Sequence, residues 1–181
     1  QTTGGHAFRV IAGYEHWFAS QGEQGAAELT ALRLLGFFDR PASRASLDAL
    51  CAAPTIAGLT EALQGLSAPR WNATLKRLAD CRLLEADVKT GGLDAYPLVR
   101  EYFADRLAQG MPKAWREGHR RLYEQLKRNT PYRPDTLEGL QPLYQAVVHG
   151  CKTGLYQEAY NEVYFERILR GAGYDGLYST R

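Results

Sequence analysis

The stretch Leu93–Phe103, with Pro97 inside it, constrains the fold of this chain most strongly. An apolar run at 83–88 precedes it, and Thr90-Gly91-Gly92 joins the two. Glycine supplies the positive φ that tight turns require, so residues 83–88 and 93–96 are predicted to form a β-hairpin. Pro97 then opens a helix. A first helical residue makes no intrahelical bond through its N–H, so the N–H that proline lacks is not needed there. A hairpin set between two helices is the outline of a winged helix-turn-helix.

The rest of the chain shows helical periodicity. Ser43 and Ser67 stand where N-caps are expected, and Asp135 with Glu138 looks like a capping box. The spacing of apolar residues predicts helices over 6–20, 26–38, 44–53, 56–66 and 68–82, and then over 97–108, 113–127, 137–153 and 156–169.

The last two predicted helices meet at Gly154. The segment 154–159 resembles the turn of a tetratricopeptide unit, in which a glycine lets two helices pack closely and the small Ala159 lies at their crossing. A helical hairpin without repeat identity fits the same residues, so both interpretations stay open. Gly171, Gly173 and Gly176 indicate a loose tail.

The predicted fold class is therefore mainly α. It combines a winged helix-turn-helix, which contains one small β-hairpin, with an α-helical arm or incomplete tetratricopeptide-like hairpin. We expect residues 1–25 to be an N-terminal helix and linker that end a preceding helical domain. Residues 26–108 are expected to form the winged-helix domain, and 109–181 the helical arm.

The composition limits the classes of protein and partner to which the chain could belong. Of 181 residues, 45% are hydrophobic and 23% charged, as in ordinary globular proteins, and a net charge of +2 gives no argument for nucleic acid. No apolar run approaches the ~18 residues of a membrane span, and no signal peptide opens the chain. The three cysteines are expected as small buried hydrophobes in a reducing cytoplasm. Because the sequence begins at Gln1, we expect a fragment of a longer protein.

Residues that could carry chemistry are sparse. The sequence contains no Gly-x-x-x-x-Gly-Lys-Ser/Thr phosphate loop and no serine in a nucleophile elbow. None of its histidines stands at metal-ligand spacing from Cys, Asp or Glu, and His119 and His149 are expected to be packed structural residues. The sequence predicts that this segment is not an enzyme and holds neither metal nor cofactor.

A winged helix often places its third helix in the major groove of DNA. Here that helix offers a possible DNA or partner surface made of Arg70, Asn72, Lys76 and Arg77. Affinity for a duplex comes mostly from neutralising phosphates, and acids on the neighbouring segments, such as Glu61 and Glu85, dilute these cations. The composition of this surface therefore disfavours DNA as a partner.

The phrase Ala95-Tyr96-Pro97-Leu98-Val99-Arg100-Glu101-Tyr102 resembles the end of the winged-helix domain in STAND signalling NTPases, the class that includes NB-ARC and NACHT proteins. In NB-ARC members a Met-His-Asp motif runs into Leu-Val-Arg-Glu, and its histidine senses bound ADP. Residues 31–41 are similar to the first helix of that domain. Residues 115–123 and 143–146 resemble the helical arm that follows it in bacterial members.

The resemblance implies a regulatory module without its nucleotide-binding core. Tyr96 stands in place of the sensing histidine and Pro97 in place of the acid after it, which makes them the candidate nucleotide-sensing residues. ADP or ATP with Mg²⁺ would be bound in the full-length protein by segments upstream of Gln1. The implied partners are the intramolecular nucleotide-binding domain, other copies of the protein on activation, and an unknown protein or peptide ligand of the helical arm, in the cytoplasm.

Two other functions remain open. One is a winged-helix transcription regulator that binds DNA, and the other is a helical adaptor that binds a peptide in a groove. A P-loop in the residues that precede Gln1 in the gene would identify the NTPase.

Overall fold

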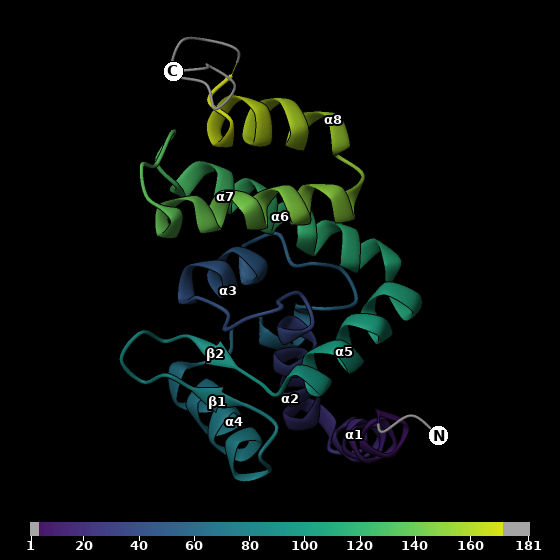
Figure 1. The fold of residues 1–181 in the computed structure, drawn as a ribbon. Coiled ribbons are helices and arrows are strands. Elements are labelled where there is room, and N and C mark those ends of the chain that lie inside the picture. The colour runs from purple at the N-terminus through teal and green to yellow at the C-terminus, as the bar shows by residue number, and fades with distance from the viewer. Residues whose placement is uncertain (1–3, 172–181) are drawn as a thin grey trace. The chain divides into compact units, whose positions relative to one another are not determined.

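The computed structural model describes residues 4–171 and is mainly helical, with one two-stranded antiparallel sheet (Figure 1). The expected glycines of the tail, Gly173 and Gly176, lie outside the described residues. The chain divides into two compact units, the first ending at Trp115 and the second beginning at Arg116. Among residues 4–171, no helix is both long and apolar enough to cross a bilayer.

The first unit contains most of the predicted elements. Its elements are α1 (Gly4–Ala19), α2 (Gly22–Leu35), α3 (Arg44–Cys51), the 3₁₀ turn η1 (Glu61–Leu63), α4 (Ala68–Asp80), β1 (Glu85–Ala86), β2 (Leu93–Asp94) and α5 (Pro97–Gly110). Ser43 caps α3 by accepting a hydrogen bond from the Ser46 amide, and Pro97 lies in the first turn of α5, as the sequence predicts.

The helix predicted over 56–66 is wrong, because only the short turn η1 forms there. Gly58 and Gly65 adopt φ of +78° and +72°, which a helix cannot contain. The Thr60 hydroxyl accepts the Ile56 amide proton at 2.8 Å and so closes a local turn at the start of this segment.

The predicted hairpin forms, although its strands are shorter than expected. In the antiparallel register of β1 and β2, Glu85 lies opposite Asp94 and Ala86 lies opposite Leu93. The Asp87 carboxylate accepts bonds from Thr90 and from the Lys89 amide, and these bonds lower the pKa of Asp87. Ala42, from the segment before α3, also bridges Leu93 and adds a single residue on the other side of β2.

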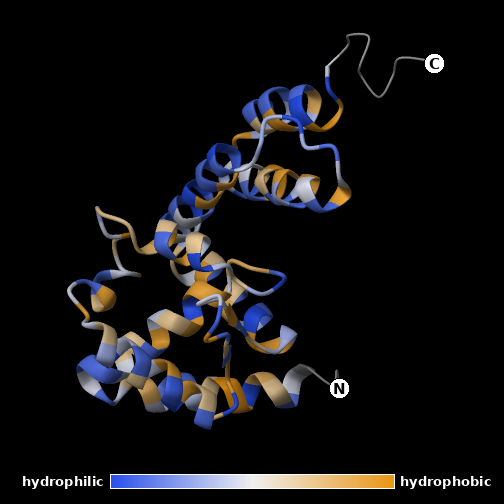
Figure 2. Cartoon of the chain, turned by 90° about the vertical axis from the view of Figure 1, so that its left-hand side faces the viewer, coloured by the Kyte–Doolittle hydropathy of each residue, from blue (hydrophilic) through white to orange (hydrophobic). Residues whose placement is uncertain are grey.

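The core of the first unit lies between α2 and α5. Leu32 and Leu35 of α2 and Phe103 and Leu107 of α5 are fully buried. At Gly36 the two helices approach so closely that an added Cβ would lie 2.7 Å from the Ala104 nitrogen. Figure 2 shows apolar stretches beside hydrophilic ones along the helices of the chain, the pattern of elements with one buried face.

Helix α1 packs on the same core, although residues 1–25 were expected to end a preceding domain. Ile11 and Phe18 are buried. The Glu15 carboxylate accepts a 2.6 Å hydrogen bond from Tyr102 and pairs with Arg33 and Arg106. Burial, and then the bond to Glu15, raise the pKa of Tyr102 to about 12. One acid thus ties α1 to both α2 and α5.

Among its described residues, the second unit is built of helices joined by a loop and a turn. It consists of most of α6 (Pro112–Asn129), with α7 (Leu137–Thr153), a single turn α8 (Tyr156–Glu158) and the π-helix η2 (Ala159–Ile168). A regular α-helix over 156–169 was predicted instead. Tyr123 of α6, Leu143 and Ala146 of α7, and Ala159 and Val163 of η2 form its core.

Three further local predictions need correction. Gly154 takes φ of +90° and caps α7, whereas the close packing occurs at Gly150, where an added Cβ would lie 2.8 Å from that of Ala159. Thr136, and not Asp135, caps α7 through the Gly139 amide. Cys51 and Cys151 are exposed rather than buried, which leaves only Cys81 partly buried.

A buried arginine holds the loop between α6 and α7. Arg167 of η2 donates hydrogen bonds to backbone carbonyls at the end of α6 and in the loop, those of Lys127, Thr130, Pro131 and Tyr132, at 2.7 to 3.0 Å. Burial lowers the pKa of Arg167, although a guanidinium keeps its proton at any ordinary pH. The cation lies where the negative end of the α6 dipole is expected.

The close approach of α2 and α5 predicts a sharp difference between two glycines. Gly36→Ala should destabilise the protein by about 1–3 kcal/mol, because backbone atoms of α5 must move. Gly13→Ala, inside α1, should stabilise it by about 0.5–1 kcal/mol, because no atom lies within 4 Å of the added Cβ. Urea unfolding measures both, and equal effects would contradict the close contact.

Candidate functional site

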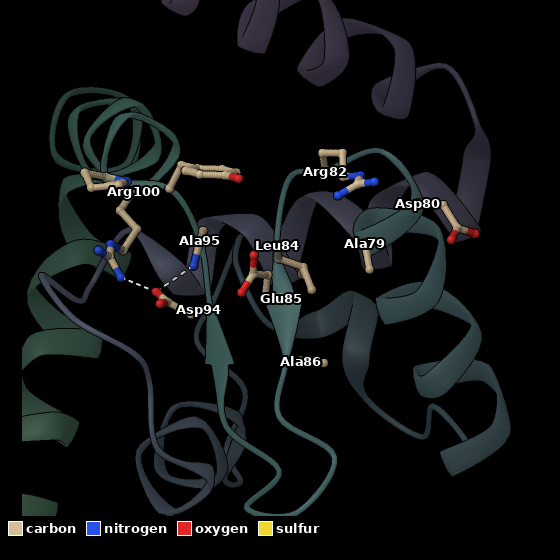
Figure 3. A pocket seen from close by; sticks show the side chains of 11 residues that line it. Ala79, Asp80, Arg82, Leu84, Glu85, Ala86, Asp94, Ala95 and Arg100 are labelled. Carbon is tan, nitrogen blue, oxygen red and sulfur yellow. Dashed lines mark hydrogen bonds and ion pairs between the residues drawn. The ribbon is translucent and has the colours of Figure 1, made fainter.

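Tyr96 and Pro97, the predicted sensing residues, lie on the wall of an open groove of about 710 Å³ in the first unit (Figure 3). The end of α4, the hairpin and the start of α5 form this groove. Its lining residues are Ala79, Asp80, Arg82, Leu84, Glu85, Ala86, Asp94, Ala95, Tyr96, Pro97 and Arg100. We call it the hairpin groove.

Tyr96 is the N-cap residue of α5. Its backbone carbonyl accepts the amide protons of Val99 and Arg100, so the first turn of the helix fixes its position. Its side chain is 62% exposed, and no hydrogen bond to the phenol occurs among the described residues. The phenol is therefore available to a ligand or partner of the hairpin groove.

Arg82 enters the groove from a strained backbone position. It follows α4 with φ of +59°, the left-handed region that glycine usually occupies at the end of a helix. The amides of Arg82 and Leu83 bond back to Ala79 and Leu78, which is the pattern of a Schellman cap. The Arg82 side chain has no ion-pair partner within residues 4–171, and a non-glycine residue here costs about 1–2 kcal/mol.

Two acids face each other across the hairpin. Glu85 and Asp94 are directly opposite in the strand register, an arrangement in which like charges repel. Arg100 of α5 forms an ion pair with Asp94 and is itself mostly buried. Glu85 has no cation partner in the described part of the chain. Figure 3 shows Arg100 and Asp94 joined, with Glu85 on the neighbouring strand.

The second predicted surface, on α4, is divided between two faces of the helix. Arg70 pairs with Glu23 and Arg77 with Glu28, both on α2, so these two cations face the first unit's own helices. Asn72 and Lys76 lie on the outer face, where Lys76 pairs with Asp80. Each of the three cations already has an acidic partner.

The Arg77–Glu28 pair is structural. Glu28 is fully buried, and burial raises its pKa despite the Arg77 guanidinium at 2.9 Å. Arg77 also lies over the ring of Trp17, at 5.7 Å from its centroid, which brings α1 into the same contact. Arg77 thus joins α4 to α1 and α2.

The second unit brings together two histidines that are 30 positions apart in the sequence. His119 of α6 and His149 of α7 are both buried, as expected, and their Nδ1 atoms lie 2.7 Å apart. Burial, and then the charges of His149 and Lys152, lower the pKa of His119 to about 2. Helical spacing placed each residue on an inner face but gave no signal that they meet.

The groups that line the hairpin groove can bind a ligand through charge and hydrogen bonds. Within residues 4–171, no group of three or more His, Cys, Asp or Glu side chains could hold a metal ion. The hairpin groove presents one aromatic hydroxyl, Arg82 and Glu85 to a ligand. No known protein family, curated protein or solved structure matches the chain.

The charges on α4 predict weak, non-specific binding to DNA. A labelled duplex at physiological salt should bind no more tightly than about 10⁻⁴–10⁻⁶ M by fluorescence anisotropy. Lys76→Ala should change this little, because Lys76 is already paired with Asp80. A nanomolar complex that Arg70→Ala or Lys76→Ala abolishes would instead establish a DNA-binding surface.

The buried histidine predicts a loss of stability in acid. Unfolded His119 would bind a proton near its ordinary pKa of about 6.5, whereas the folded residue binds it only near 2, so acid favours the unfolded state. Between pH 7 and pH 5 this effect should lower the free energy of unfolding by about 2 kcal/mol.

Replacing the titrating ring tests this linkage. His119→Asn keeps a hydrogen-bonding atom near the Nδ1 position and should lose less stability than the wild type between pH 7 and pH 5, as measured by urea unfolding. His16→Asn, at an exposed site on α1, is the control and should follow the wild type. Parallel pH profiles for all three proteins would contradict the prediction.

Proposed function

We propose that this chain is the non-catalytic regulatory module of a STAND signalling NTPase, made of a winged-helix domain and the helical arm that follows it. In this proposal the module packs on a nucleotide-binding domain and holds the protein inactive. It then relays the binding of a sensed ligand to oligomerisation in the cytoplasm.

The order of elements in the first unit supports a winged helix. Three helices, α2, α3 and α4, are followed by the hairpin and then by α5. The segment between α2 and α3 makes a strand-like bridge from Ala42 to Leu93. A winged helix has its first strand at this place in the chain. DNA-binding and regulatory winged helices share this order of elements. The two functions are therefore distinguished by the charges on α4 and in the hairpin groove.

The observation that carries the proposal is the place of Tyr96. The phrase that resembles the nucleotide-sensing motif lies at the hairpin groove, with its phenol exposed and its backbone fixed by α5. The cations that a DNA reader would need are paired with acids of the same unit. The favoured contact surface is therefore the hairpin groove rather than the outer face of α4.

Tyr96 would act as a latch for the inactive state. A neutral hydrogen bond from its phenol contributes about 0.5–1.5 kcal/mol, and one to a charged phosphate up to about 3 kcal/mol. About 1.4 kcal/mol is a tenfold change in an equilibrium, so such a bond could set the balance between closed and open states. A tyrosine cannot carry the charge of a histidine, so the latch would depend little on pH near neutrality.

The second unit would be the start of the arm. Gly150, Ala159 and Tyr123 bring α7, η2 and α6 into close contact, which makes the unit a rigid element suited to transmit movement. Its short hairpin of α7 and η2 would continue into tetratricopeptide-like repeats that sense a protein or peptide ligand. Other copies of the protein would be its partners after activation.

A helical adaptor is the second candidate function. Exposed apolar side chains on the second unit favour it: Leu137, Tyr144 and Val148 on α7, and Tyr156 and Tyr160 beyond it. The residues that precede Gln1 in the gene separate the two candidates, because only the NTPase requires a P-loop there.

The proposal predicts that the Tyr96 hydroxyl retains ADP. In the full-length protein, Tyr96→Phe should release ADP up to about tenfold faster and raise basal activity, because about 1.4 kcal/mol corresponds to a tenfold change. The same change should leave the stability of residues 1–181 unaltered, because no hydrogen bond to this phenol occurs among the described residues. Release of a fluorescent ADP analogue measures the rate.

Tyr132→Phe is the matched control, because Tyr132 is also an exposed tyrosine but lies in the second unit. It should release ADP at the wild-type rate. Identical rates for all three proteins would mean that Tyr96 is no latch, and a full-length protein that binds no nucleotide would refute the proposed function itself.

A further inference from the structure

We propose that the hairpin groove binds a polypeptide segment that presents both an acidic and a basic side chain. Arg82 would receive the acid, Glu85 would receive the base, and the ring of Tyr96 would pack against the segment. The inference deepens the proposed function and rests on it only for the origin of the segment, which would be the nucleotide-binding domain of the same protein.

The charges that remain unpaired in the groove have opposite signs. Lys76 neutralises Asp80, and Arg100 neutralises Asp94. Within the described chain this leaves Arg82 and Glu85 as the lining residues whose charge has no partner. A ligand that carries both signs satisfies both groups, whereas a ligand of one sign satisfies one and is repelled by the other.

A bare phosphate fits this pattern poorly. It could pair with Arg82, but it would leave the Glu85 carboxylate without a cation and would be repelled by it. An acidic side chain on a segment that also carries a base is therefore the better partner for Arg82, and in this arrangement only the Tyr96 hydroxyl would reach a nucleotide.

The backbone around the groove also suits a polypeptide. Among the described residues, β1 pairs with β2 alone, so its outer edge has main-chain groups that no described strand uses. An extended segment alongside Glu85 and Ala86 could form main-chain hydrogen bonds there while its side chains reach Arg82 and Tyr96. The strained backbone of Arg82 keeps a long cation where a glycine would fit better, which is consistent with a role for its side chain.

A photo-crosslinker at the groove tests the inference in the full-length protein. Tyr96→p-benzoylphenylalanine places a reactive ketone at the groove, and mass spectrometry identifies the peptide that it captures. The expected product is one defined peptide that contains both an acidic and a basic residue. The same crosslinker at Tyr132, which is exposed in the second unit, is the control and should not capture that peptide.

Two charge variants then test how the segment is held. Arg82→Gly should lower the crosslinking yield about fivefold, the effect of losing one exposed ion pair. Because glycine relieves the positive φ, this variant should be at least as stable as the wild type, so a lost crosslink cannot reflect unfolding. Glu85→Lys should lower the yield as well. Reversing the captured basic residue to an acid should restore crosslinking by the Glu85→Lys protein.

Three results would overturn the inference: no peptide adduct above the Tyr132 control, an adduct that contains only one sign of charge, or a yield that neither charge variant changes. Faster ADP release by Arg82→Gly without any peptide adduct would assign the groove to the nucleotide. A charge-sensitive adduct in a protein that lacks a P-loop would support the groove and refute the proposed function, so the two failures are distinguishable.

Discussion

The contact between α2 and α5 at Gly36 is the constraint on which the first unit depends. Only a residue without a Cβ lets the end of α2 lie against the backbone of Phe103 and Ala104. That contact fixes α5 along its length, and α5 begins at Pro97, so it also fixes where Tyr96 stands. Glu15 reinforces the arrangement, because its carboxylate joins α1 to Arg33 of α2 and to Tyr102 and Arg106 of α5.

The candidate site combines this rigid helix start with a strained residue. The position of Arg82 follows from the end of α4, whereas the position of Tyr96 follows from the start of α5, and the hairpin joins the two. A groove built in this way is held open by the packing of both helices. Binding to such a groove would therefore carry little conformational entropy cost for ordering the groove itself.

Local chemistry explains which features could be predicted from the sequence. Pro97 opens α5, Ser43 caps α3, and a glycine-containing turn makes the hairpin, because each effect acts over a few residues. The missed features depend on distant residues. The His119–His149 contact and the pairing of Arg77 with buried Glu28 require helices that only tertiary packing brings together. The same holds for Gly150, whose role depends on what lies opposite it, whereas the more conspicuous Gly154 serves only as a cap.

Arg167 makes the loop between α6 and α7 dependent on a residue that the ribosome adds much later. The carbonyls that it bonds belong to residues 35 to 40 positions earlier in the chain. During synthesis the residues of α6, α7 and their connection are therefore all in place before the side chain that bonds this connection. The hydrogen bonds of Arg167 can form only once η2 has been added.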